Sequence, residues 1–241
     1  PYVIAGPCSA ESRQQMLDAV VPLRGLPGLG ALRAGIWKPR TRPGSFEGIG
    51  REALPWLVEA GKELGLPVAA EVAKPDHVEA CLREGVDILW VGARTTVNPF
   101  YVQELAESLK GTDVSVLVKN PIHPEIGLWL GALERFDKAG IQHLGAVHRG
   151  YFSLNAAPYR NEPGWELAIE LKEHNPELPV IVDPSHISGK RKLVTEIAQI
   201  GMELGLDGLM VEVHAAPDNA LSDAAQQLLP TDLQDLLGQI R

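Results

Sequence analysis

The chain has 241 residues, of which 45% are hydrophobic and 22% charged, and its net charge is -9 at neutral pH. This size fits one large α/β barrel or two small domains, and the acidic balance argues against a nucleic-acid-binding surface. No apolar run reaches the roughly 18 residues that span a bilayer, and no signal peptide opens the chain, so we expect a cytoplasmic protein without a membrane partner. The cysteines, Cys8 and Cys81, are too few for a disulfide framework.

Apolar runs alternate with amphipathic segments along the whole chain. The first run, residues 2–5, stops at Gly6-Pro7 and is followed by a helical pattern that includes Met16 and Val20. Further strands are expected at residues 32–37, 67–72, 88–92, 114–118, 144–148, 179–183 and 208–213. Further helices are expected near residues 50–65, 75–84, 98–109, 124–139, 162–174, 190–204 and 221–237.

This repeat predicts an α/β fold, a (β/α)8 TIM barrel. Eight strand-helix units in 241 residues match the barrel in number and in size. A doubly wound open sheet is the alternative, but no Gly-x-Gly-x-x-Gly follows the first strand. No linker interrupts the repeat, so we expect a single catalytic domain over residues 1–241, without an N-terminal regulatory extension.

Two connections, residues 39–50 and 151–161, are longer than is usual between a strand and a helix. Long loops inside a compact domain are usually functional. The first follows a basic cluster that includes Arg33, Lys38, Arg40 and Arg42. Focused positive potential in an acidic protein attracts anionic ligands, although a solvated loop would also be polar. We therefore expect a small anion to bind near this loop.

The carboxyl ends of barrel strands share one face, which is where barrel enzymes have their active sites. Polar and reactive residues gather at these ends: Cys8, Lys38, Arg40, Thr41, Glu71, Arg94, Lys119, Asn120, Arg149, Asp183, Ser185, His186, Glu212 and His214. Arg94 is followed by two hydroxyl residues and a helix start, which together are typical of a phosphate site. The pattern predicts one pocket that is rich in cations.

Lys119 and Arg149 each follow strand residues that should point into the barrel with them. An inward cation needs an anion, and the structural alternative is an ion pair with Glu71 or Asp183. His148 should face outward. The other histidines receive no role: His77, His123, His143 and His174.

The position numbers of Arg33 and Lys38 differ by an odd number, so strict alternation would place their side chains on opposite faces of a strand. Both can reach the pocket only if a bulge intervenes or if Lys38 lies beyond the end of the strand.

A second set of residues suggests a metal site. Cys8, His186 and Glu212 follow or end strands one, seven and eight, and a thiolate, imidazole and carboxylate together suit Mn, Fe, Co or Zn. Spacing does not choose between Asp218 and Asp223 as a fourth ligand. Each residue has an ordinary structural alternative, for example a small buried thiol or a partner for an arginine. Their shared position favours the metal.

Together these motifs resemble those of the type I 3-deoxy-D-arabino-heptulosonate 7-phosphate (DAHP) synthases. The matching segments keep the family's order over essentially the whole chain: Ala5-Gly-Pro-Cys-Ser, Lys38-Pro-Arg-Thr, Gly92-Ala-Arg-Thr-Thr, Val118-Lys-Asn, His148-Arg-Gly, Asp183-Pro-Ser-His, Met210-Val-Glu and Leu221-Ser-Asp. The family fold is a (β/α)8 barrel, as the repeat also predicts. The resemblance implies a transferase that condenses phosphoenolpyruvate with erythrose 4-phosphate, giving DAHP and phosphate in the first step of the shikimate pathway.

The resemblance also implies roles for individual residues. The ligands of a divalent metal, with manganese the preferred candidate, would be Cys8, His186, Glu212 and Asp223. Phosphoenolpyruvate would be held by Arg94, Lys119 and Arg149, with Arg33 and Lys38 near its carboxylate and the reacting centre. Erythrose 4-phosphate would bind Arg40 and Thr41. The catalytic residues would be Lys38, Cys8 and His186.

The main alternative is 3-deoxy-D-manno-octulosonate 8-phosphate synthase, which uses arabinose 5-phosphate and carries Lys-Ala-Asn-Arg in place of Lys38-Pro-Arg-Thr. The proline stiffens that turn and favours the shorter sugar. A non-catalytic phosphometabolite-binding barrel is a further alternative. Family members are usually homo-oligomers, dimers or tetramers. The chain starts at Pro1, within an apolar run, so we expect an unregulated enzyme, one half of a fusion with chorismate mutase, or regulation by a separate partner.

Overall fold

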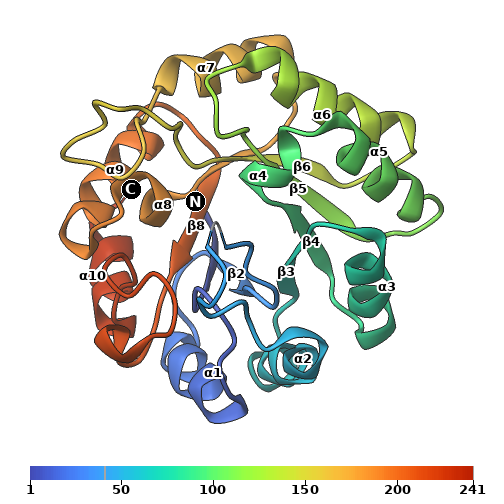
Figure 1. Ribbon diagram of the computed structural model, residues 1–241. Helices are drawn as coiled ribbons and strands as arrows, with labels where there is room; N and C mark the ends of the chain where they lie inside the picture. Colours follow the sequence, from blue (N-terminus) through green and yellow to red (C-terminus); the bar gives the residue numbers. More distant parts are fainter. Residues whose placement is uncertain (41, 241) are drawn as a thin grey trace.

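The computed structural model describes residues 1–40 and 42–240, in which parallel strands close into a barrel in the order β1-β2-β3-β4-β5-β6-β7-β8 (Figure 1). The strands are β1 (Tyr2–Gly6), β2 (Leu29–Ala34), β3 (Val68–Val72), β4 (Ile88–Val91), β5 (Ser115–Lys119), β6 (Leu144–His148), β7 (Val180–Val182) and β8 (Gly208–Glu212). The last strand pairs with the first, which places Tyr2 opposite Gly208 and Gly6 opposite Glu212. The predicted (β/α)8 barrel is confirmed.

Helices surround the barrel (Figure 1). They are α1 (Arg13–Val20), α2 (Leu54–Leu64), α3 (Pro75–Glu84), α4 (Ala93–Thr96), α5 (Pro99–Ser108), α6 (Ile126–Lys138), α7 (Trp165–His174), α8 (Pro184–Ser188), α9 (Arg191–Glu203) and α10 (Pro230–Gln239). Capping residues define several helix ends. The Ser12 and Asn98 side chains accept hydrogen bonds from backbone N–H groups in the first turns of α1 and α5. Helix α2 ends at Gly65, which has the left-handed conformation. Among the described residues, no helix has both the length and the apolar character needed to cross a bilayer.

The short helices α4 and α8 were not predicted, because four or five residues give no periodicity to detect. Two other expectations need correction. The second strand ends at Ala34 rather than at residue 37, so Lys38 lies beyond it, and this resolves the alternation problem without a bulge at that point. The last helix begins at Pro230, since the segment before it runs back beside β8, where Leu228 N–H donates to Glu212 O at 2.8 Å.

The barrel interior is closed below its mouth by apolar side chains. They are Ile4, Ala31, Ala69, Ile88, Trp90, Leu117, Val147, Ile181 and Met210. Trp90 is the largest, and its indole N–H donates to Glu71 Oε2 at 3.2 Å. The Arg33 guanidinium lies over this indole, with Cζ 4.8 Å from the ring centroid. The charged groups at the strand ends are therefore supported from below by a solid apolar layer.

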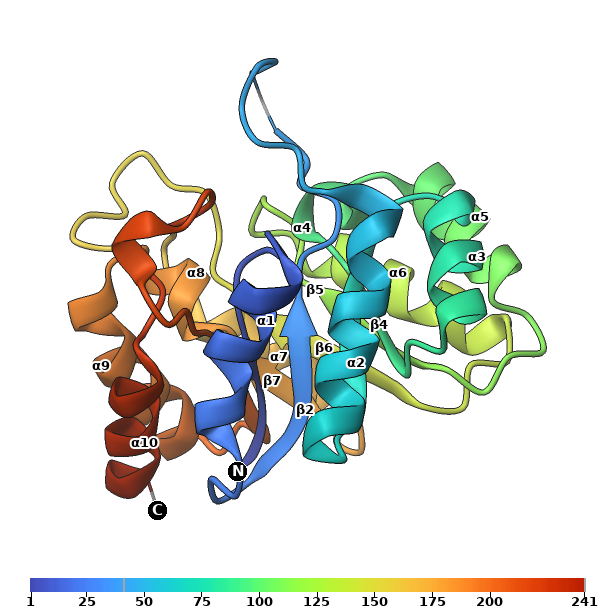
Figure 2. The same cartoon turned by 90° about the horizontal axis from the view of Figure 1, so that it is seen from below.

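The two long connections rise from the same end of the barrel. In the side view of Figure 2, the described residues between β2 and α2 and those between β6 and α7 extend beyond the strands, opposite the end where the N-terminus lies. His148, at the end of β6, points away from the barrel as predicted, but it is buried among Trp129, Tyr151 and Trp165. Both long connections therefore lie at the carboxyl ends of the strands.

Two helical glycines test how closely the helices pack on the barrel. A Cβ at Gly61 in α2 would come within 2.3 Å of Val68 Cγ1, whereas at Gly131 in α6 it would meet only the flexible end of Arg135, at 3.4 Å. We expect Gly61→Ala to lower the free energy of unfolding by about 1–3 kcal/mol through overpacking. Gly131→Ala, the matched control, should raise it by about 0.5–1 kcal/mol through helix propensity. Urea titration of both variants measures this, and equal shifts would contradict the packing described here.

Candidate active site

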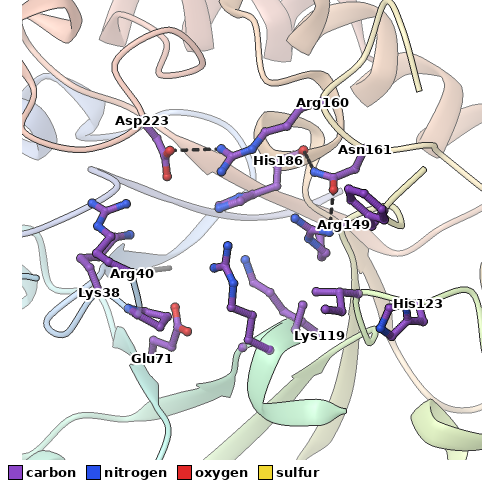
Figure 3. A pocket seen from close by; sticks show the side chains of 16 residues that line it. Lys38, Arg40, Glu71, Lys119, His123, Arg149, Arg160, Asn161, His186 and Asp223 are labelled. Carbon is purple, nitrogen blue, oxygen red and sulfur yellow. Dashed lines mark hydrogen bonds and ion pairs between the residues drawn. The ribbon is translucent and has the colours of Figure 1, made fainter. Parts of the chain in front are cut away.

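Side chains from several strand ends line one cavity of about 610 Å³. Its cations are Lys38, Arg40, Arg94, Lys119, Arg149 and Arg160. Figure 3 shows Asp223 and His186 on the same wall as Arg160. Lys119 ends β5, Arg94 lies on α4 directly after β4, and His186 lies on α8 directly after β7. Because the strands are parallel, their carboxyl ends bring these groups to one mouth.

Lys38 lies against Cys8 at one side of the cavity. Its Nζ donates hydrogen bonds to Cys8 Sγ and Cys8 O, each at 3.0 Å. Burial, together with the charge of Glu212, raises the pKa of Cys8 to about 12. Burial alone would lower the pKa of Lys38, but Cys8 and Glu212 raise it above its usual range. The pair therefore places an ammonium group beside a sulfur that can bind a metal.

Glu212 is a fully buried carboxylate at the end of β8. Its Oε2 accepts a hydrogen bond from Gln226 Nε2 at 2.7 Å, and its Oε1 lies 3.3 Å from Arg33 Nη1. Burial opposes ionisation, but His186 and Arg33 keep the pKa of Glu212 below its usual value. The carboxylate is therefore ionised, and its Oε1 has no hydrogen-bond partner within the described part of the chain.

Asp183 joins the imidazole to one of the cavity lysines. Its Oδ2 accepts a hydrogen bond from Lys119 Nζ at 2.6 Å and lies 2.8 Å from His186 Nδ1. Burial opposes its ionisation, yet His186 and Lys119 hold the pKa of Asp183 well below its usual range. Burial lowers the pKa of His186, so the imidazole is neutral. A hydrogen on Nδ1, the ring nitrogen that faces Asp183, would leave Nε2, 3.8 Å from Glu212 Oε1, available to a metal.

The donor set fits a divalent metal. Ligand atoms of Cys8, Glu212 and Asp223 lie within 4.8 Å of one another, and His186 Nε2 is next to Glu212. Glu212 Oε1 is buried near Arg33 but accepts no hydrogen bond from the described residues, so it can still bind a metal, and the mixed sulfur, nitrogen and oxygen donors suit Mn, Fe, Co or Zn. Asp218, the other candidate from spacing, is exposed and pairs with Arg191 at 2.9 Å. The geometry therefore favours Asp223 over Asp218.

Two of the predicted anion-binding cations are already paired inside the protein. Lys119 pairs with Asp183, and Arg33 pairs with Glu212. Both cations therefore form the internal ion pair that was the alternative to binding an anion. Arg33 is 1% exposed and lies beneath the donor set, where its Nη2 donates to Cys8 O at 3.1 Å, rather than on the cavity wall. Its contacts support Glu212 and Cys8.

The other predicted cations are open to the cavity. Arg94 is exposed, and the ion pairs formed among the described residues do not include it. Burial lowers the pKa of Arg149 to about 10, and its Nη1 donates to Asn161 Oδ1 at 3.0 Å. Arg40 donates through Nε to Phe46 O at 2.7 Å, within the connection between β2 and α2. Thr41, predicted to bind the second substrate, lies outside the described residues.

Sequence reasoning missed several residues of the cavity. They are Ile122, His123, Phe152, Arg160 and Asn161. Arg160 donates through Nη1 to Asp223 Oδ1 at 3.1 Å, and Asn161 donates through Nδ2 to His186 O at 2.7 Å (Figure 3). The length of the connection between β6 and α7 was the available signal, since it marked residues 151–161 as functional. It did not show which of them turn inward.

A family model described as the DAHP synthetase I family matches residues 1–240 of the chain. Among curated proteins, phospho-2-dehydro-3-deoxyheptonate aldolase of Thermotoga maritima is 34% identical over 226 residues, which cover 94% of this chain and 64% of that protein. The chain thus spans less than two thirds of that relative. A 2-dehydro-3-deoxyphosphooctonate aldolase of a Synechococcus species is 30% identical, with 83% of this chain and 72% of that protein covered.

Two solved structures from Thermotoga maritima have the same fold. The crystal structure of its phospho-2-dehydro-3-deoxyheptonate aldolase (DAHP synthase) superposes with a TM-score of 0.88 at 31% identity, covering 99% of this chain and 67% of that chain. A truncated form of 3-deoxy-D-arabino-heptulosonate 7-phosphate synthase superposes with a TM-score of 0.85 at 28% identity, covering 99% and 84%.

The buried pair of Lys119 and Asp183 can be tested by removing its negative charge. We expect Asp183→Asn to lower the free energy of unfolding by about 3–5 kcal/mol, because it leaves a buried ammonium uncompensated. Glu59→Gln, which breaks the exposed pair with Arg13, is the control and should hardly move the urea midpoint. If the two variants unfold at the same urea concentration, the buried pair does not stabilise the fold.

Proposed function

Since the chain belongs to the DAHP synthetase I family, we propose that it condenses phosphoenolpyruvate with D-erythrose 4-phosphate to give DAHP and inorganic phosphate. The observation that carries the proposal is one cavity with cations around its mouth and a set of metal-binding donors on one wall. Two phosphorylated substrates need separate positive sites to approach each other closely. This reaction would be the first step of the shikimate pathway and would take place in the cytoplasm.

Phosphoenolpyruvate would bind between Arg94, Lys119 and Arg149, which line the same cavity. Arg94 is exposed at its mouth, and a guanidinium group binds phosphate oxygens in pairs. Erythrose 4-phosphate would bind through Arg40 and Thr41, on the loop that follows β2. The cations then hold the two phosphates apart while the carbon atoms that react meet between them.

The donor side chains of Cys8, His186, Glu212 and Asp223 would hold a divalent metal. When bound, the metal supplies a Lewis acid that draws electrons from the aldehyde oxygen. Lys38, whose ammonium lies 3.0 Å from Cys8 Sγ, would donate a proton to that oxygen as the new bond forms. Asp183 keeps the imidazole of His186 oriented, and Arg33 offsets the buried charge of Glu212.

The proposed reaction balances without an oxidant or a reductant. C3 of phosphoenolpyruvate uses its double-bond electrons to form a bond to the aldehyde carbon, and C2 becomes electron-poor. Water then adds to C2 and loses one proton, which replaces the proton given by Lys38. The bond between C2 and the phosphate oxygen breaks with its electrons leaving on phosphate, while the new C2 hydroxyl becomes the carbonyl of DAHP and its proton passes to the phosphate. Lys119 and Arg149 would stabilise the charge of the departing phosphate.

The chain should release phosphate from phosphoenolpyruvate only when erythrose 4-phosphate is present. A chelator should stop the release, and added Mn²⁺ should restore it, which a colorimetric phosphate assay can follow. Turnover with arabinose 5-phosphate alone would instead indicate 3-deoxy-D-manno-octulosonate 8-phosphate synthase. Absence of chelator-sensitive turnover with either sugar would indicate a non-catalytic phosphometabolite-binding barrel.

The two buried cysteines provide a matched pair of variants. We expect Cys8→Ala to lower metal-dependent kcat by more than about 100-fold, the upper range for losing a residue that only supports a ligand. Cys81→Ala, which removes a buried thiol of α3 far along the chain from the donor set, should retain activity. Circular dichroism confirms that both variants fold. Retained activity in Cys8→Ala would remove the thiol from the metal site.

A further inference from the structure

Arg160 and Asn161 form a dipeptide that is fixed against α8. The backbone N–H groups of both residues donate to Ile187 O at 3.1 Å. Gly189, with a φ of 63°, lets the Arg160 side chain cross closely, since a Cβ there would lie 2.3 Å from Arg160 Cβ. The start of the Arg160 side chain is therefore held in place, although the side chain as a whole is 41% exposed.

One nitrogen of Arg160 contacts Asp223 directly and is connected to Glu212 through Gln226. Nη1 donates to Asp223 Oδ1 at 3.1 Å and to Gln226 Oε1 at 2.8 Å. Gln226 is 2% exposed, and its Nε2 donates to Glu212 Oε2 at 2.7 Å. A primary guanidinium nitrogen carries two hydrogens, so one group can make both bonds.

These bonds divide the oxygens of the two carboxylates into two kinds. Asp223 Oδ1 and Glu212 Oε2 are occupied by donors. Asp223 Oδ2 accepts instead from Cys8 Sγ at 3.3 Å, and Glu212 Oε1, which accepts no hydrogen bond from the described residues, lies 3.3 Å from Arg33 Nη1 and 3.8 Å from His186 Nε2. One oxygen of each carboxylate is thus bound to Arg160 or Gln226, and the other faces the thiol or the imidazole.

The backbone of Asp223 needs such support. Its φ is 48°, and it is the one residue other than glycine in the described chain with a positive φ. A carboxylate on a strained turn, near a second carboxylate, would otherwise turn away from it toward solvent. The bond from Arg160 holds it inward.

We propose that Arg160 is a positioning residue for the metal site, acting on Asp223 directly and on Glu212 through Gln226. This inference rests on the proposed function, because it requires that the donor set binds a divalent metal. It assigns to Arg160 a role toward the ligands rather than toward the substrate phosphates.

The sign of the effect separates positioning from simple electrostatics. A guanidinium cation repels a nearby metal cation, so charge alone predicts that Arg160→Gln binds metal more tightly. Positioning predicts weaker binding, because the carboxylates lose the contacts that orient them. Arg160→Lys keeps the charge but not the planar geometry that satisfies two acceptors, so positioning predicts weaker binding here too.

The experiment titrates chelator-treated protein with Co²⁺ alone, in the absence of substrates, and follows the thiolate-to-cobalt absorption band. We expect Arg160→Gln to raise the Kd about 10-fold or more and Arg160→Lys to raise it by a smaller factor. Arg24→Gln is the matched control, since Arg24 is a similarly exposed arginine paired with Glu63, and it should leave the Kd unchanged. Urea titration confirms that each variant is folded under the conditions of the binding assay.

An unchanged or lower Kd in Arg160→Gln would overturn the positioning role and leave the proposed function standing. If the unsubstituted protein binds no Co²⁺, the metal site of the proposed function fails, and the positioning role fails with it.

Discussion

Hydrogen bonding between β1 and β8 closes the barrel, and the candidate active site depends on that closure. The pairing puts Gly6 opposite Glu212, so that Cys8, two residues further on, lies at the same mouth. Asp223 then contacts a thiol that is 215 positions away in the chain. Parallel strands that closed one step out of register would separate these groups, since a shift by one residue turns every side chain to the other face. The donor set is therefore a property of the closed sheet and not of any local segment.

Buried charge is the second feature that organises the site. Arg33 with Glu212 and Lys119 with Asp183 form ion pairs that are almost inaccessible to solvent. Removing such groups from water costs several kcal/mol for each ion, which close pairing offsets only in part. Apolar side chains would have stabilised the barrel at least as well. We interpret these pairs as the means by which Glu212 and Asp183 stay ionised and oriented within an apolar wall.

The fold could be predicted largely from the sequence, because the repeat of apolar runs and amphipathic helices continues through the whole chain. The cation-rich mouth also followed from it, since Arg94, Lys119 and Arg149 come directly after strands. The sequence named Asp183 only as one possible partner of an inward cation, because the pair that forms depends on tertiary register, which periodicity does not report. The position of Arg160 in the cavity could not be predicted either, because backbone hydrogen bonds to α8 hold this residue in place. The end of β2 was misplaced because the apolar run continues to Trp37, past the last residue that pairs in the sheet.

The ion pair between Lys119 and Asp183 has a consequence for the arrival of a ligand. Lys119 donates one of its three ammonium hydrogens to Asp183, so a phosphate that accepted the other hydrogens would draw the ammonium group away from this carboxylate. Asp183 also contacts His186. A weaker bond from Lys119 to Asp183 would therefore change the electrostatic environment of the imidazole. Occupation of the anion pocket would in this way be transmitted to the opposite wall through a single shared carboxylate, without movement of the barrel itself.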